Sequence, residues 1–302
     1  MLLTQLEQAS NKALQRAYIA ISELGEKGRE VTGETNEFGN VTFQADIEAG
    51  KAVFDSLRER DIRVFMFSEE HGSEVRIGKN PKILGVIDEL DGSKPYKDGS
   101  GRYATMLSFF DGLDPKYDDY LVSGILDYIN AQIFLAVKDQ GAYIISVKGG
   151  DKFQIHCSAS KNLNPKTTRI RVDGWFPENL TLAQKLGSFE NMFIGSPKNS
   201  GASCQYYMDL ARGEADIVIE CTRKRNLEIA ACYGLIREAG GVVITLVDGS
   251  WVELGDLKYL EFGQKQNDRI PVVSAANREL ANEFVSLTKK LASEIDDFRS
   301  IQ

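Results

Sequence analysis

Residues 83–93 read Ile-Leu-Gly-Val-Ile-Asp-Glu-Leu-Asp-Gly-Ser, and this stretch decides the fold class. The apolar run 83–87 has the length and composition of a strand that is buried on both faces. The run is followed directly by Asp88 and Asp91, and ligands of α/β folds bind where such strands emerge from the core. We therefore predict an α/β fold with an acidic site at the end of this strand.

Two carboxylates that lie close together define the chemistry expected of this site. Asp88 and Asp91 are separated by what the sequence predicts to be a tight turn, and they would repel each other unless a cation lay between them. Hard oxygen ligands suit Mg²⁺ or Mn²⁺ rather than Zn²⁺. Gly92 allows close backbone approach, and Ser93 is a predicted helix N-cap whose neighbouring amides would suit a phosphate. The alternative is a solvated turn after a core strand.

The rest of the chain alternates helices and strands. Helical spacing of apolar residues predicts helices over 2–24, 45–59, 179–187, 201–212, 227–239 and 278–298, with a loop over 25–41. Short apolar runs predict strands over 63–67, 83–87, 103–111, 120–128, 131–138, 143–147, 168–172, 191–194, 216–220, 242–246 and 271–274. We expect an N-terminal α+β lobe over 1–150 that carries the acids, and a C-terminal α/β lobe over 151–302 that completes the site.

Composition excludes several classes of protein. The net charge of −8 argues against nucleic-acid binding by counterion release. The four cysteines lack zinc-ligand spacing, and the two histidines supply Ser-His-Asp chemistry poorly. No apolar run is long enough to cross a membrane, and the first residues lack the pattern of a signal peptide, so we expect a cytoplasmic protein without a membrane partner.

The motifs together resemble the inositol monophosphatase and fructose-1,6-bisphosphatase superfamily. Ser68-Glu-Glu70 precedes Ile87-Asp-Glu-Leu-Asp-Gly-Ser93, and Leu227-Glu-Ile-Ala-Ala-Cys-Tyr-Gly-Leu-Ile-Arg-Glu-Ala-Gly-Gly241 is similar to the second family signature. The resemblance covers about residues 40–280 in order. It implies a layered α-β-α-β-α sandwich, a Mg²⁺-dependent phosphatase activity on a small phosphorylated substrate, and, by analogy, a homodimer.

The resemblance also assigns roles to individual residues. It implies metal ligands at Glu69, Asp88, Leu90 (through its carbonyl), Asp91 and Glu228. It implies that Ser93 and Asp46 align the attacking water, with Glu69 as a further catalytic residue. It implies substrate contacts from Gly92, Ser93, Gly201, Ala202, Ser203 and Glu220. From the residues themselves, the basic run 223–225, with Arg225, is either a clamp for a second phosphate or a solvated loop.

Three positions depart from the family pattern. Glu228 replaces the usual Asp, Glu89 replaces Pro and Leu227 replaces Trp. The expected substrate is inositol monophosphate or a sugar phosphate such as fructose 1,6-bisphosphate. Two alternatives stay open. Lys94 favours a 3′-phosphoadenosine nucleotidase, while Glu89 and Glu228 motivate a non-catalytic relative that binds metal or phosphate ligands.

Overall fold

Two β-sheets form the main layers of the computed structural model, which describes residues 2–36, 40–70, 74–164, 167–172, 202–222, 227–261 and 270–294. The larger sheet runs in the order β10-β9-β8-β7-β6-β5-β3-β4, and the smaller runs β11-β12-β15-β13-β14. The larger sheet contains β3 (Val64–Ser68), β4 (Val75–Ile77), β5 (Ile83–Asp91), β6 (Ala104–Asp111), β7 (Tyr120–Asp127), β8 (Gln132–Val137), β9 (Gly141–Ser146) and β10 (Phe153–Ile155). The smaller contains β11 (Ile170–Val172), β12 (Ile217–Thr222), β13 (Val242–Val247), β14 (Ser250–Glu253) and β15 (Ile270–Ala275).

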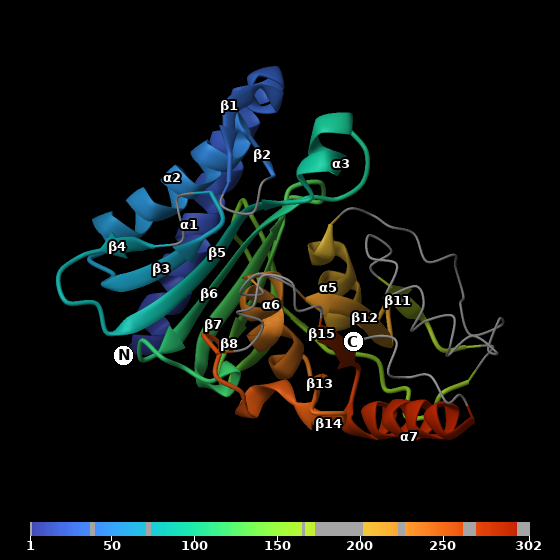
Figure 1. Cartoon of the computed structure of the whole chain (residues 1–302). Coiled ribbons are helices and arrows are strands. Elements are labelled where there is room, and N and C mark those ends of the chain that lie inside the picture. The colour runs from blue at the N-terminus through green and yellow to red at the C-terminus, as the bar shows by residue number, and fades with distance from the viewer. Residues whose placement is uncertain are drawn as a thin grey trace.

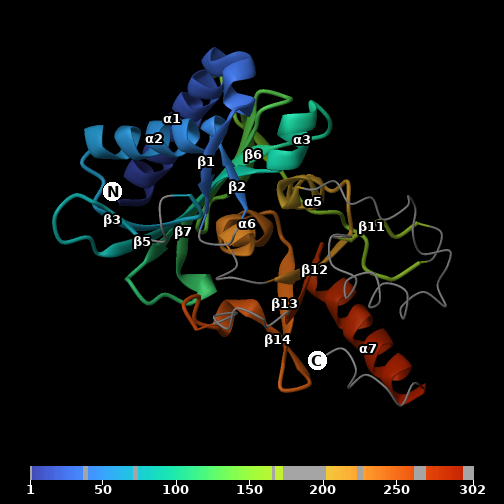
Figure 2. The same ribbon diagram turned by 45° about the horizontal axis from the view of Figure 1, so that its top comes forward.

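Helices lie on both sides of each sheet. The helices are α1 (Leu2–Leu24), α2 (Gln44–Glu59), α3 (Ser93–Asp98), α5 (Ser203–Ala211), α6 (Leu227–Glu238) and α7 (Arg278–Glu294). Figures 1 and 2 show α1 and α2 on the outer face of the larger sheet, α5 and α6 between the sheets, and α7 beyond the smaller sheet. This layering confirms the predicted α-β-α-β-α sandwich.

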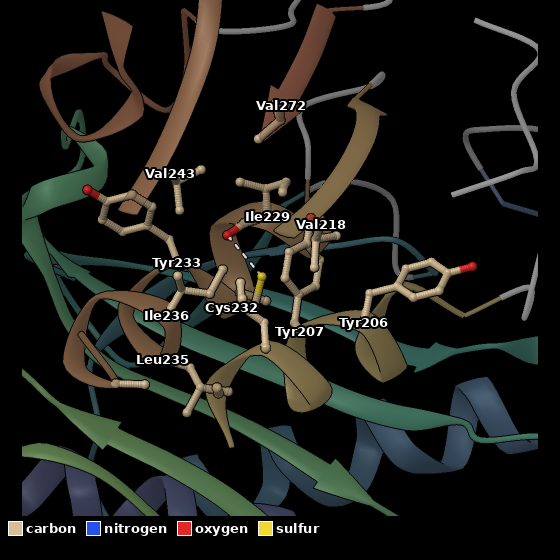
Figure 3. Close-up of a cluster of buried hydrophobic side chains, with 14 of the residues drawn as sticks. Tyr206, Tyr207, Val218, Ile229, Cys232, Tyr233, Leu235, Ile236, Val243 and Val272 are labelled. Atoms are coloured by element: carbon tan, nitrogen blue, oxygen red, sulfur yellow. Dashed lines mark hydrogen bonds between the residues drawn. The ribbon is translucent and has the colours of Figure 1, made fainter. Parts of the chain in front are cut away.

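The helical cover explains why the central strands carry apolar residues on both faces. Every residue of β5 from Ile83 to Leu90 is buried, because α2 lies on one side of the strand and α6 on the other. Figure 3 shows the core between the sheets, where Tyr207 of α5 and Cys232 of α6 lie among apolar side chains of β12, β13 and β15. Acids at the ends of these strands therefore sit at the edge of a packed core.

Several sequence expectations need correction. The predicted loop over 25–41 contains a 3₁₀ helix (Gly25–Arg29) and a two-stranded hairpin of β1 (Val31–Thr35) and β2 (Val41–Phe43). The strands β4, β10 and β14 were not predicted. The helix over 179–187 and the strand over 191–194 lie outside the described residues. The first sheet collects strands up to Ile155 and the second begins at Ile170, and the division into lobes at residue 150 remains a proposal.

No described helix combines the length and the apolar composition needed to cross a bilayer.

Candidate active site

A β-bulge brings Asp88 and Asp91 to the same side of β5. Residues three apart in a regular strand point to opposite faces. Pairing with β6 passes from Asp88↔Met106 to Asp91↔Ala104, so three steps on β5 match two steps on β6. The amide of Leu90 donates to Asp88 Oδ1 over 3.1 Å within this bulge. Our expectation of a tight turn between the two acids was wrong, because both lie inside the strand. The bulge, and not a turn, places their side chains on the same side.

Glu69 joins them because β3 runs parallel to β5. Ser68, the last residue of β3, pairs with Ile87, so the turn that carries Glu69 begins beside Asp88. Burial first, and then the negative charges of Glu228 and Glu70, raise the pKa of Glu69 to about 8. The side-chain amides of Asn36 and Asn40 donate to Glu69 Oε1 over 2.7 and 3.2 Å.

The charge of Glu228 acts on Glu69 and Asp88. Glu228 belongs to α6, which lies on the opposite side of β5 from α2. It lies in the first turn of α6, where a negative charge is favoured by the helix dipole. Burial raises the pKa of Asp88 well above its ordinary value, and the charges that add to this effect are those of Glu69, Asp91, Glu228 and Glu89. The charges of these acids therefore act on one another, whereas no three Cys, His, Asp or Glu side chains of the described ranges lie at metal-ligand spacing. Metal binding by these carboxylates stays a prediction.

Asp91 is turned toward the second half of the chain. Its Oδ1 accepts the amide of Ser203 over 3.2 Å, and its Oδ2 accepts the amide of Cys204 over 2.6 Å. These amides belong to the first turn of α5, whose N-cap is Ala202. The expected substrate segment thus meets the acid cluster directly, whereas Gly201 and Arg225 lie outside the described residues.

Ser93 and Asp46 have well-defined partners at the start of α3 and α2. Ser93 is the first residue of α3 and Gly92 its N-cap, which corrects our expectation that Ser93 would be the cap. Ser93 Oγ donates to the Leu90 carbonyl over 2.9 Å. Asp46 accepts the Phe43 amide over 2.6 Å, and burial followed by the charge of Glu70 raises its pKa to about 8. The pairing of Asp46 with Ser93 stays a prediction.

Glu220 lies on β12 and is buried. Burial is the main cause of the raised pKa of Tyr207 on α5, and the charge of Glu220 adds to it. Glu220 is therefore close to the helix whose first turn contacts Asp91, which agrees with the expected substrate side of the site.

A model of the inositol monophosphatase family matches residues 2–292. The chain belongs to this family. The "Fructose-1,6-bisphosphatase/inositol-1-monophosphatase" of Thermococcus kodakarensis is 24% identical over 258 residues, which cover 84% of this chain and 86% of that protein. The "Bifunctional NADP phosphatase/NAD kinase" of Methanococcus maripaludis is 26% identical over 231 residues, or 72% of this chain, but the match spans only 39% of the Methanococcus protein.

A solved structure supports the fold independently. The extragenic suppressor protein suhB from Bartonella henselae superposes with a TM-score of 0.72 at 18% identity, covering 96% of this chain and 99% of that one. Membership places the chain in a family of phosphatases, hydrolases that act on small phosphorylated substrates.

Sequence reasoning missed several residues of this inositol monophosphatase family site. Asn36 Nδ2 bridges Glu69 and Glu70, with 3.0 Å to Glu70 Oε1, and the Thr42 hydroxyl also donates to Glu70. The β-branched pairs at 31–32 and 41–42 flank a polar segment, a hairpin signal that could have revealed this contact. The fully buried Glu89, where the family has Pro, accepts the Ser68 hydroxyl.

Gly92 yields a test of the local geometry. Its φ is +88°, and an added side-chain carbon would lie 2.9 Å from Ala202 Cβ and 2.9 Å from the Arg102 carbonyl oxygen. We expect Gly92→Ala to destabilise the protein by about 1–3 kcal/mol and to separate α5 from Asp91.

The matched control is Gly99→Ala. Gly99 also has a positive φ, of +65°, but an added carbon would lie no closer than 3.6 Å to any neighbour. Urea unfolding and phosphate release measure both variants. Equal losses of activity in the two would contradict the close contact between Gly92 and α5.

Proposed function

We propose that this protein is a magnesium-dependent phosphatase that hydrolyses a small phosphate monoester, inositol monophosphate or a sugar phosphate such as fructose 1,6-bisphosphate. The observation that supports it is the convergence on Asp88 of charge from Glu69, Asp91 and Glu228, three acids from three separate segments. Such a cluster is costly by itself and is stabilised by a divalent cation.

The donor set fits Mg²⁺. Carboxylates of Glu69, Asp88, Asp91 and Glu228 and the carbonyl of Leu90 are hard oxygen ligands, which Mg²⁺ prefers. A bound ion would neutralise phosphate charge and make a coordinated water more acidic. The residues of the chain would hold the reactants around it.

Each remaining residue has a role that its position allows. The Gly92 and Ser93 amides at the start of α3 would hold phosphate oxygens. Ser93 Oγ donates its hydrogen bond to the Leu90 carbonyl. The lone pairs of this hydroxyl could therefore accept a hydrogen bond from the attacking water. Asp46 would help orient that water, while Ala202, Ser203 and Glu220 would contact the substrate's alcohol portion.

A nucleotide substrate is the second candidate. The similarity to a protein named as an NADP phosphatase favours a phosphate on a nucleoside ribose, as does Lys94 beside Ser93. The 3′-phosphoadenosine nucleotidase alternative belongs to this class.

A substrate panel tests the proposal. Inorganic phosphate release would be measured with inositol 1-phosphate, fructose 1,6-bisphosphate, NADP⁺ and 3′-phosphoadenosine 5′-phosphate, with Mg²⁺ and with EDTA. We expect release from at least one of the first two that requires Mg²⁺. Release from the nucleotides alone would favour the second candidate, and no release at all would favour the non-catalytic relative. The expected homodimer remains a proposal. Size-exclusion chromatography with light scattering, which measures the molar mass in solution, tests it.

Glu228 is where this chain departs from its family, so its role is tested separately. Removing a metal ligand weakens ion affinity, and we expect Glu228→Gln to raise the half-activating Mg²⁺ concentration by at least about tenfold. We expect Glu228→Asp to impair activation too, because a site adjusted to the longer side chain is too wide for the shorter one.

The control is Glu238→Gln at the other end of α6, where the carboxylate accepts bonds from Tyr120 and Gly141. This variant should keep the wild-type Mg²⁺ requirement. If Glu228→Gln keeps it as well, Glu228 is not a ligand.

A further inference from the structure

Asp209 of α5 is the acceptor for three arginines. Arg102 Nη1 lies 3.0 Å from Asp209 Oδ1, Arg212 Nη2 lies 3.1 Å from the same oxygen, and Arg171 Nε lies 3.3 Å from Oδ2. The Asp209 side chain is only 7% exposed. Charge pairs shielded from water in this way are stronger than surface pairs.

Arg102 differs from the other two arginines in where it comes from. Arg171 lies on β11 and Arg212 directly follows α5, so both belong to the second half of the chain. Arg102 lies between α3 and β6, in the segment that follows Asp91. Of the three ion pairs, the Arg102–Asp209 pair is therefore the one that ties α5 to the part of the chain that carries the acids.

The same two segments meet a second time at the acid itself. Asp91 accepts the amides of Ser203 and Cys204. The backbone of Arg102 and Tyr103 lies against Gly92, next to Asp91. Cys204 and Asp209 are five residues apart, about 7.5 Å along the helix axis, so α5 is attached at two separated points.

Two points of attachment fix the direction of a helix where one would leave it free to pivot. With the Arg102 pair in place, the first turn of α5 is held on Asp91, and the two amides fix the rotation of that carboxylate. Groups that orient a metal ligand typically change metal affinity by 10–100-fold.

We propose that Arg102 is a positioning residue: by its ion pair with Asp209 it holds the first turn of α5 on Asp91 and so orients this carboxylate for the activating cation. The inference rests on the proposed function in one respect, that Asp91 is a metal ligand.

The chain supplies a matched control. Arg171→Ala removes one guanidinium from Asp209, as Arg102→Ala does, but from the side of β11. Either variant leaves Asp209 with two arginines, so its buried charge stays paired in both. The buried Asp127, whose Oδ2 lies 3.8 Å from Arg102 Nε, keeps the amides of Ile129 and Asn130.

The experiment measures the site without substrate. Mn²⁺ binding by electron paramagnetic resonance gives Kd, and hydrogen exchange of the Cys204 amide reports its bond to Asp91. We expect Arg102→Ala to raise the Mn²⁺ Kd about tenfold and to speed Cys204 exchange, while Arg171→Ala changes Kd less than about twofold. Arg102→Lys, which keeps the charge, should recover part of the loss.

Equal effects of Arg102→Ala and Arg171→Ala on Mn²⁺ binding would overturn the proposal, as would an Arg102→Ala Kd within twofold of wild type. A wild-type protein that binds no Mn²⁺ would also overturn it. If Arg102→Ala does not fold, Arg102→Gln and Arg171→Gln, which also remove the charge, are compared by the same criterion. A protein that binds Mn²⁺ but releases no phosphate from any substrate would contradict only the proposed function. The Mn²⁺ Kd and the exchange of the Cys204 amide do not require turnover, so they still test the role of Arg102.

Discussion

Replacing Asp88 by asparagine should abolish phosphate release and, at the same time, stabilise the protein in the absence of divalent cations. Asp88 is buried among Glu69, Asp91, Glu228 and Glu89, and this environment raises its pKa. Asparagine removes the repelled charge while its oxygen still accepts the Leu90 amide. We expect a loss of activity of at least about 100-fold.

The stability effect reverses when Mg²⁺ is added. In EDTA the variant should unfold about 2–3 °C above wild type, a gain of about 1–2 kcal/mol. In Mg²⁺ the wild-type protein gains stability by binding the ion and the variant does not, so the order of the two melting temperatures should invert. Differential scanning calorimetry in both buffers measures this. A variant less stable than wild type in EDTA would mean that the cluster carries no strain for a cation to relieve.

Replacing Asp216 by asparagine should destabilise the protein and leave its Mg²⁺ requirement unchanged, the reverse of the result expected for Asp88→Asn. Asp216 is buried, accepts two hydrogen bonds from the Arg169 guanidinium over 3.0 and 3.1 Å, and also accepts the Arg169 amide and the Ser158 hydroxyl. Burial alone would raise the pKa of Asp216, but the bonds from Arg169 and Ser158 outweigh it and hold the pKa below its ordinary value. We expect Asp216→Asn to cost about 2–3 kcal/mol, or about 3–5 °C in Tm.

The pH dependence fixes the cause of that loss. Because the folded pKa is lowered, the charge of Asp216 stabilises the protein above its unfolded pKa of about 3.9 and ceases to do so as pH falls through the folded pKa. The difference in Tm between wild type and variant should therefore stay constant from pH 7 to about 5 and shrink below about pH 4. The folded variant should retain the wild-type Mg²⁺ requirement. A difference in Tm that does not change with pH would assign the loss to packing.

The acids were predictable from sequence because their signal is local. Each follows an apolar run or opens a helix, and parallel pairing of β3 with β5 places Glu69 beside Asp88. The bulge was not predicted, since the apolar run alone does not show that β5 continues through Asp91. The contacts of Asn36 with Glu69 and Glu70 were not predicted either, because they join residues more than thirty positions apart.

The helix cap shows a further limit. Ser93 has the residue type of an N-cap, yet the backbone at Gly92 adopts a left-handed conformation and takes that position. The close approach of Ala202 and Arg102 to Gly92 joins segments far apart in the sequence. Local propensity identified the turn, and tertiary contact decided its geometry.

The bulge in β5 explains why the number of residues between Asp88 and Asp91 matters. In an uninterrupted strand only even spacings place two side chains on one face, and Asp88 and Asp91 have an odd spacing. Side chains alternate between the two faces of a strand, and the extra residue of the bulge reverses this alternation. Asp91 therefore lies on the same face as Asp88. In this strand, which is buried on both faces, the odd spacing between two acids whose charges act on each other thus goes with a break in the alternation. Deleting or inserting one residue between them would turn Asp91, the last residue of β5, to the other face of the strand, so the interval of three matters to the site as much as the carboxylates do.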